Sequence, residues 1–191
     1  MEKDRLEAFS DGVIAILITI LVLEFKAPHG DKWTDLLPML PTFGAYVLSF
    51  LYLGIYWNNH HHMLQTITKT NGSILWANLH FLFWLSLIPF ATGWMGESYF
   101  TGTPIAFYGI ILFMAGNSYF ILQKAIIRFQ GKDSILGKAI GKDKKGKVSI
   151  VSYLLAIVIS FKLPSISVVL YIAIALLWLI PDKRIERTLS S

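Results

Sequence analysis

Long stretches of this sequence contain no charged residue, and this spacing constrains the fold more than any other feature. Asp, Glu, Lys and Arg are all absent from residues 36–68, 70–96, 98–123, 148–161 and 163–181. A helix that crosses a hydrocarbon core of about 30 Å needs about 20 apolar residues, and each interval is that long or nearly so. Together with the apolar run before Glu24, the intervals predict an all-α polytopic membrane protein with six transmembrane helices.

Prolines help to set the approximate boundaries of these helices within a single membrane domain over residues 1–191. Pro38 or Pro41 suits the first turn of the second helix. Pro164 separates the last two helices, and Pro181 ends the last one. The six expected helices cover about 4–25, 38–64, 73–93, 104–127, 148–161 and 165–180. The sequence shows no internal repeat and no soluble domain.

The distribution of Lys and Arg predicts that both termini are cytoplasmic. In this orientation fourteen of the 17 basic residues face the cytoplasm and only Lys26, Lys32 and Lys162 lie outside, as the positive-inside rule expects. Eight of the fourteen lie in the connection 124–147, which is expected to favour anionic lipid headgroups. The net charge of +5 is therefore explained by membrane orientation, and no nucleic-acid partner is expected.

Several kinds of chemistry have no counterpart in the sequence. There is no cysteine, so neither a disulfide nor a thiolate metal site is possible. We find no nucleophile elbow, no phosphate-binding loop and no carboxylate pair placed for acid–base catalysis, and we expect that the protein is not an enzyme. The histidine run at residues 60–62 lacks the partner spacing of a zinc-binding helix, which favours a structural role and predicts no metal or cofactor.

The first expected helix is unusual because it contains a charge within its apolar stretch. Asp11 lies about two turns into the helix, and an ionisable group at such a depth is usually paired. Arg5 is six residues away, which is a poor pairing distance along a helix. We therefore expect a partner on another helix, such as a backbone donor, a histidine or a tryptophan. The alternative is a hydrated Asp11 at the membrane interface.

Two further patterns in the expected helices bear on packing. Ile16, Ile20 and Leu23 share one face of the first helix, with Thr19 beside them. This stripe is compatible with ordinary helix packing, with contact to lipid, or with the lining of a narrow pore. In the third helix Asn78 and Ser86 are polar within apolar surroundings, and we expect interhelical hydrogen bonds from them.

The motif of the first helix resembles the signature of the transmembrane protein 175 family of potassium channels. It begins at Arg5 and continues Leu-Glu-Ala-Phe-Ser-Asp-Gly, and Thr19 follows Asp11 by eight residues within an apolar run. Prokaryotic members of the family have six helices and about this length, whereas animal members carry the unit twice. Phe-Ser-Asp occurs once here, which resembles the prokaryotic form.

The resemblance implies a homotetramer in the plasma membrane of a prokaryotic cell, with four copies of the first helix around a pore. The residues implied as pore-lining are Ile16, Thr19, Ile20 and Leu23. Ile16 would form the tightest ring. Ile20 stands where other members carry leucine, and this departure keeps the ring at that position apolar. A second group would brace the helix near the cytoplasmic mouth, namely Arg5, Phe9, Ser10, Asp11, Trp57 and His61. His60 is the alternative to His61, shifted by one residue.

The expected function is a potassium-permeable, weakly selective cation channel with a hydrophobic isoleucine and leucine constriction. The sequence has no Thr-Val-Gly-Tyr-Gly filter, so selectivity would come from pore diameter, ion dehydration and the Thr19 hydroxyls. Potassium would be the permeant ion, and no cofactor is expected. A secondary or proton-coupled transporter and a membrane scaffold without transport activity are the alternatives. Transporters more often show internal repeats and broken helices at the membrane midplane.

Overall fold

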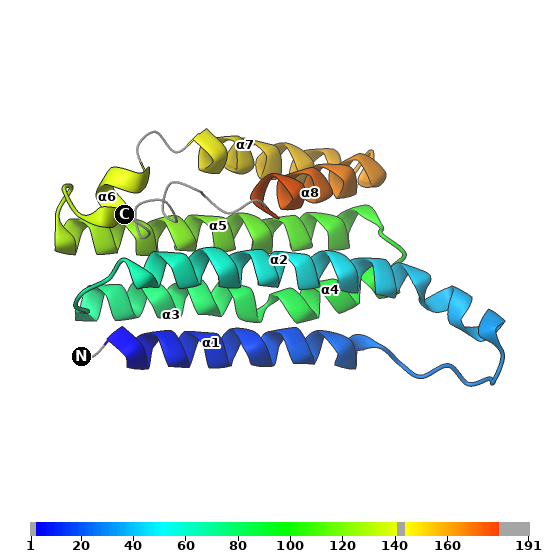
Figure 1. Cartoon of the computed structure of the whole chain (residues 1–191). Helices are drawn as coiled ribbons and strands as arrows, with labels where there is room; N and C mark the ends of the chain where they lie inside the picture. The colour runs from blue at the N-terminus through cyan, green and yellow to red at the C-terminus, as the bar shows by residue number, and fades with distance from the viewer. Residues whose placement is uncertain (1–2, 141–143, 180–191) are drawn as a thin grey trace.

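All regular structure in the described part of the chain is helical. The computed structural model describes residues 3–140 and 144–179. Its elements in chain order are α1 (Lys3–Ile20), η1 (Leu21–Glu24), η2 (Trp33–Met39), α2 (Leu40–Gln65), α3 (Gly72–Ser86), α4 (Ile88–Glu97), α5 (Gly102–Gln130), α6 (Ile135–Ile140), α7 (Lys144–Ile159) and α8 (Pro164–Leu179). The elements run side by side as an elongated bundle (Figure 1).

Four described stretches are long and apolar enough to cross a membrane, namely Lys3–Glu24, Trp33–Gln65, Gly72–Glu97 and Gly102–Gln130. Lys3–Glu24 consists of α1 followed by the 3₁₀ segment η1, and Trp33–Gln65 consists of the 3₁₀ segment η2 followed by α2. Gly72–Glu97 consists of α3 followed by α4. The last two expected spans correspond to α7 and α8, which have 16 residues each. These two helices are shorter than the ~20 residues of a typical span.

The third stretch is interrupted because α3 ends at Ser86 and α4 starts at Ile88. Leu87 caps the end of α3 and also precedes the first turn of α4. Pro89 lies in that first turn, where its missing N–H needs no partner. The chain therefore continues in nearly the same direction after a local break (Figure 1).

The helices form a layered arrangement with α1 at one edge (Figure 1). α1 packs against α2 and α3, whereas α5 packs against α3, α4 and α7. α7 and α8 pair with each other on the side of the bundle opposite α1. One long face of α1 is thus left without a neighbour in the described chain.

Tyrosine hydroxyls connect the buried helices in the middle of the bundle. Tyr52 on α2 donates a hydrogen bond to the Tyr171 carbonyl of α8 at 2.7 Å. Tyr171 in turn donates to the Ile105 carbonyl of α5 at 3.2 Å. Both rings are almost fully buried, so these bonds satisfy polar atoms that have no access to solvent.

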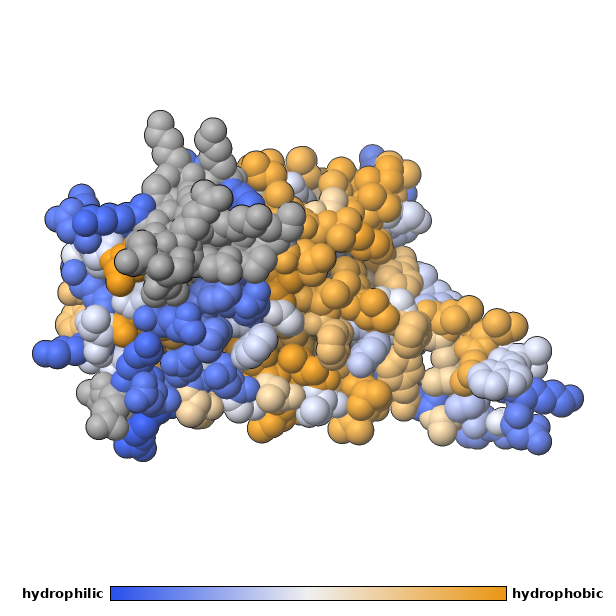
Figure 2. Space-filling model, in the orientation of Figure 1, coloured by the Kyte–Doolittle hydropathy of each residue, from blue (hydrophilic) through white to orange (hydrophobic). Residues whose placement is uncertain are grey.

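The surface is apolar around the middle of the bundle and hydrophilic towards its ends (Figure 2). One hydrophilic end carries the start of α1, the α2–α3 connection and α6 (Figure 1). The turns between α4 and α5 and between α7 and α8 lie towards the other end (Figure 1). An apolar belt between two polar ends is the surface that a lipid bilayer requires.

Candidate functional site

α1 has one buried face and one exposed face. Leu6, Ser10, Ile14 and Leu17 are buried, and their spacing of three and four residues places them on the side that meets α2 and α3. The opposite side, which continues into η1, carries three large apolar residues at intervals of seven.

These residues are Phe9, Ile16 and Leu23, with exposed fractions of 51%, 58% and 74%. Thr19 is also exposed, and Ile20 is half-buried. The Thr19 hydroxyl donates a hydrogen bond to the Ile16 carbonyl of its own helix at 2.8 Å. The four residues implied as pore-lining therefore lie towards the outside of the bundle.

A buried chain of hydrogen bonds joins α1, α3 and α2. The Ser10 hydroxyl donates to the Leu6 carbonyl at 2.8 Å and accepts a bond from the Asn78 amide at 2.9 Å. The carbonyl oxygen of Asn78 lies 2.7 Å from Nε2 of His60, which also stacks on Phe81. Ser10, Asn78 and His60 have no exposed surface, so their mutual bonds replace those that water would otherwise provide.

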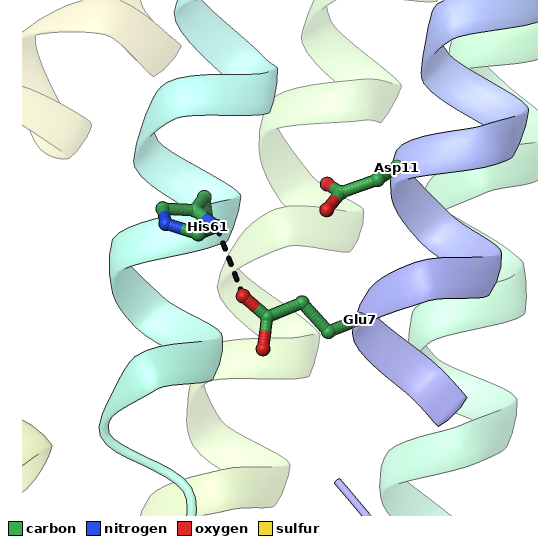
Figure 3. A group of neighbouring side chains, drawn as sticks. All are labelled: Glu7, Asp11 and His61. Atoms are coloured by element: carbon green, nitrogen blue, oxygen red, sulfur yellow. Dashed lines mark ion pairs between the residues drawn. The ribbon is translucent and has the colours of Figure 1, made fainter. Parts of the chain in front are cut away.

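A second group of contacts joins α1 directly to α2. The indole N–H of Trp57 donates to the Asp11 carboxylate at 3.0 Å. One turn earlier on α1, Glu7 Oε1 lies 3.0 Å from Nδ1 of His61, and the His61 ring stacks on Trp57. Figure 3 shows the Glu7 and Asp11 side chains reaching from α1 towards His61 on α2.

The structure brings together four of the six residues proposed to brace α1. Ser10, Asp11, Trp57 and His61 all take part in contacts between helices. Phe9 points away from the bundle, and Arg5 is exposed without a hydrogen bond or ion pair to any described residue. His60 contributes as well, because it reaches Ser10 through Asn78.

Neither the contact of Glu7 nor the pairing of Asn78 with Ser10 was expected from the sequence. Glu7 could have been noticed because it lies four residues before Asp11 and therefore shares its helix face. Asn78 makes the interhelical bond that was expected of it. Ser86 does not, because it is exposed and bonds to the Phe83 carbonyl of its own helix.

At the opposite end of α1, a surface ion pair connects the segment after η1 to α4. Lys26 forms a hydrogen-bonded ion pair with Glu97 at the end of α4. The Glu97 carboxylate raises the pKa of Lys26 above its ordinary value. Both side chains are largely exposed, so this contact contributes little to stability.

Comparison with known proteins gives concordant matches. The family described as "Endosomal/lysosomal potassium channel TMEM175" matches residues 5–89. A potassium channel of Chryseobacterium sp. is 58% identical over 99% of this chain and 98% of its own length. An endosomal/lysosomal proton channel TMEM175 of Gallus gallus is 32% identical over 48% of this chain and 21% of its own.

A solved structure has the same fold. It is described as a lysosomal potassium-selective channel TMEM175 homolog from Chamaesiphon minutus. The two chains superpose with a TM-score of 0.80 at 26% sequence identity. The match covers 95% of this chain and 98% of the other.

Proposed function

This chain belongs to the TMEM175 channel family, and from that premise we propose that it is a potassium-permeable, weakly selective cation channel. The observation that carries the proposal is the exposed face of α1. Ile16 on α1 and Leu23 on η1 are large, apolar and more than half exposed, although the other face of α1 is buried. Four copies of this face around a common axis would enclose a narrow apolar pore.

In the proposed homotetramer, Ile16 forms the tightest ring, and Ile20 and Leu23 extend the constriction. A hydrophobic ring of this kind closes a pore by excluding water. Thr19 supplies the polar group of the proposed pore lining. Its hydroxyl proton is directed to the Ile16 carbonyl, which leaves the oxygen lone pairs available to a partly dehydrated cation. Potassium loses its water more readily than sodium, so such a pore prefers potassium weakly.

The contacts between α1 and its neighbours support a bracing role for the residues at its inner end. The Ser10–Asn78–His60 chain and the Trp57–Asp11 bond fix the rotation of α1 about its own axis. That rotation decides which side chains face the pore. Arg5 and Phe9 are exposed in the single chain, and we propose that they brace α1 against a neighbouring subunit.

We further propose that each subunit crosses the membrane six times with both termini in the cytoplasm. The alternation of connections between the two ends of the bundle supports this topology (Figure 1). The basic connection 124–147 then lies on the cytoplasmic side, where anionic lipid headgroups would be its partners. The proposed location is the plasma membrane of a prokaryotic cell, and we propose neither an enzymatic activity nor a cofactor.

Liposomes that contain the purified protein and a potassium gradient test the proposed function. We expect passive potassium flux, and we expect Ile16→Asn to increase it because an amide ring keeps the constriction hydrated. Ile172→Asn on α8 is the control, since Ile172 is also exposed but lies on a different helix. Equal flux from Ile16→Asn and the unmodified protein would exclude Ile16 as the constriction.

The same liposomes distinguish the alternative, a proton-coupled transporter. The vertebrate relatives are described as proton channels, so proton movement has to be measured alongside potassium. A pH-sensitive dye inside the vesicles reports it. A saturable potassium flux that stops when the proton gradient is clamped would indicate a coupled carrier. Fast flux without saturation indicates a channel.

A further inference from the structure

Two carboxylates and an imidazole converge between α1 and α2. Glu7 and Asp11 are one helical turn apart on α1, and His61 faces them from α2 (Figure 3). One ligand atom from each of the three side chains lies within 4.8 Å of the other two. We propose that Glu7, Asp11 and His61 form a site for a divalent transition-metal ion of the Zn²⁺ type, which links α1 to α2.

The distances fit such an ion after a small movement of one side chain. Zn²⁺ binds oxygen and imidazole nitrogen at about 2.0–2.2 Å, which separates two tetrahedral ligand atoms by about 3.4 Å. Glu7 Oε1 and His61 Nδ1 are already 3.0 Å apart. Asp11 is half-buried, and only one of its carboxylate oxygens is held by Trp57, so a turn of the carboxylate can bring the second oxygen towards them.

The nitrogen that would bind the metal is available. Nδ1 of His61 is shielded from solvent and makes no hydrogen bond of acceptable geometry, although Glu7 Oε1 is close to it. A buried polar atom without a hydrogen bond is rare and calls for a partner. A metal ion between the imidazole and the two carboxylates would be that partner.

Neighbouring side chains orient two of the three ligands. Nε2 of His61 lies 2.9 Å from the amide nitrogen of Gln65. The oxygen and nitrogen of a glutamine amide are interchangeable by a half-turn, and with the oxygen towards the ring Gln65 would accept the Nε2 proton. That arrangement leaves Nδ1 free for the metal. The Trp57 indole holds one oxygen of Asp11, so the second oxygen remains for coordination. Outer partners of this kind are characteristic of metal-binding histidines and carboxylates.

The donor set selects the class of ion. Mg²⁺ and Ca²⁺ prefer ligands that are all oxygen. One imidazole and two carboxylates instead suit Zn²⁺, Co²⁺ or Ni²⁺, and the two negative charges balance the ion. Three protein ligands leave a fourth position for water. Because metal binding joins two helices, it should stabilise the fold whether or not the chain conducts ions.

Titration of the purified full-length protein with Co²⁺ tests the site directly. We expect one Co²⁺ per chain with a visible absorption band of a four-coordinate site, and a rise in melting temperature with Zn²⁺. Glu7→Gln and His61→Gln should each weaken Co²⁺ binding by about tenfold or more, since loss of even an outer partner costs that much. His62→Gln is the control, as His62 is adjacent on α2 but outside the cluster.

Binding that is equally strong in His61→Gln and the unmodified protein would overturn the proposal, and so would the absence of binding by the unmodified protein. Melting temperatures measured without metal show whether a variant still folds. Glu7 is half-buried and replaced by a side chain of the same shape, so Glu7→Gln should keep its metal-free melting temperature. The Co²⁺ affinity of Glu7→Gln then reports on the metal site and not on folding.

Discussion

Single buried polar residues position α1 against its neighbours. Ser10, Asn78 and His60 come from three different helices and have no exposed surface. The Asn78 amide donates to Ser10, so a shift of α1 by one residue would break this bond and leave the amide N–H buried without that acceptor. Apolar packing alone discriminates less strongly between the native position of α1 and a shifted one, because hydrophobic contacts are not directional.

Replacement of Asn78 measures this contribution. Asn78→Leu removes both of its interhelical bonds and leaves the Nε2 proton of His60 buried without an acceptor. We expect a loss of about 1–3 kcal/mol in the free energy of unfolding, measured by denaturation in detergent micelles. Ser86→Ala on the same helix is the control and should change stability by less than about 0.5 kcal/mol, because Ser86 is exposed. Equal effects of the two changes would contradict the role of Asn78.

Residue-level features differ in how far the sequence reveals them. Asp11 is conspicuous because a charge two turns into an apolar helix needs a partner, and the structure supplies the Trp57 indole. The link from Ser10 to His60 passes through Asn78, and it depends on which face of α3 meets α1. That face is set by packing of the whole bundle, because α3 is apolar all round and has no distinct hydrophobic stripe.

Between elements, one close backbone approach brings α4 against α2. A Cβ atom added to Gly96 would lie only 2.6 Å from the Thr42 Cα atom. Backbone atoms cannot rotate out of the way as a side chain can, so Gly96→Ala has to separate the two helices. We expect it to lower the free energy of unfolding by about 1–3 kcal/mol, the usual range for overpacking.

Gly54→Ala is the matched control for this change. Gly54 lies within α2, and a Cβ atom there would meet nothing within 4 Å. Alanine is the better helix former by about 1 kcal/mol, so stability should stay equal or rise. Melting of both variants in the same detergent makes the comparison. A Gly96→Ala protein as stable as Gly54→Ala would show that the α2–α4 contact is loose.

The sequence indicates where helices occur more reliably than where they end. The charge-free intervals locate the helical stretches because charge is excluded from a hydrocarbon core for a simple energetic reason. The break between α3 and α4 follows from Pro89, but its position also depends on the packing around Leu87. α5 continues to Gln130 and ends where Gly131 adopts a positive φ of 93°. The short helix α6 lies in a connection whose polar composition gives no periodic signal.

Considered as a whole molecule, the chain carries an apolar face on α1 that its own bundle does not cover. A cyclic assembly would cover that face with identical copies of itself, and a rotation that closes gives a ring. The number of copies does not follow from the composition or the helix pattern of one chain. It rests on the family resemblance, so it needs a direct measurement.

A single engineered thiol tests both the copy number and the position of α1. The natural sequence has no cysteine, so Leu23→Cys introduces one reactive site per chain. If four α1 helices surround the axis, Leu23 residues of neighbouring subunits face one another, and a short bis-maleimide should join chains into dimers. Native mass spectrometry of the unmodified protein should give four times the chain mass.

The control for this experiment is Ile172→Cys on α8. Ile172 is exposed as well, but α8 lies on the side of the bundle opposite α1. It should give little cross-linking under the same conditions. A tetramer that cross-links through Ile172→Cys and not through Leu23→Cys would place a different helix at the axis. Because Leu23 on η1 continues the exposed face that carries Ile16 on α1, that result would also remove Ile16 from the pore.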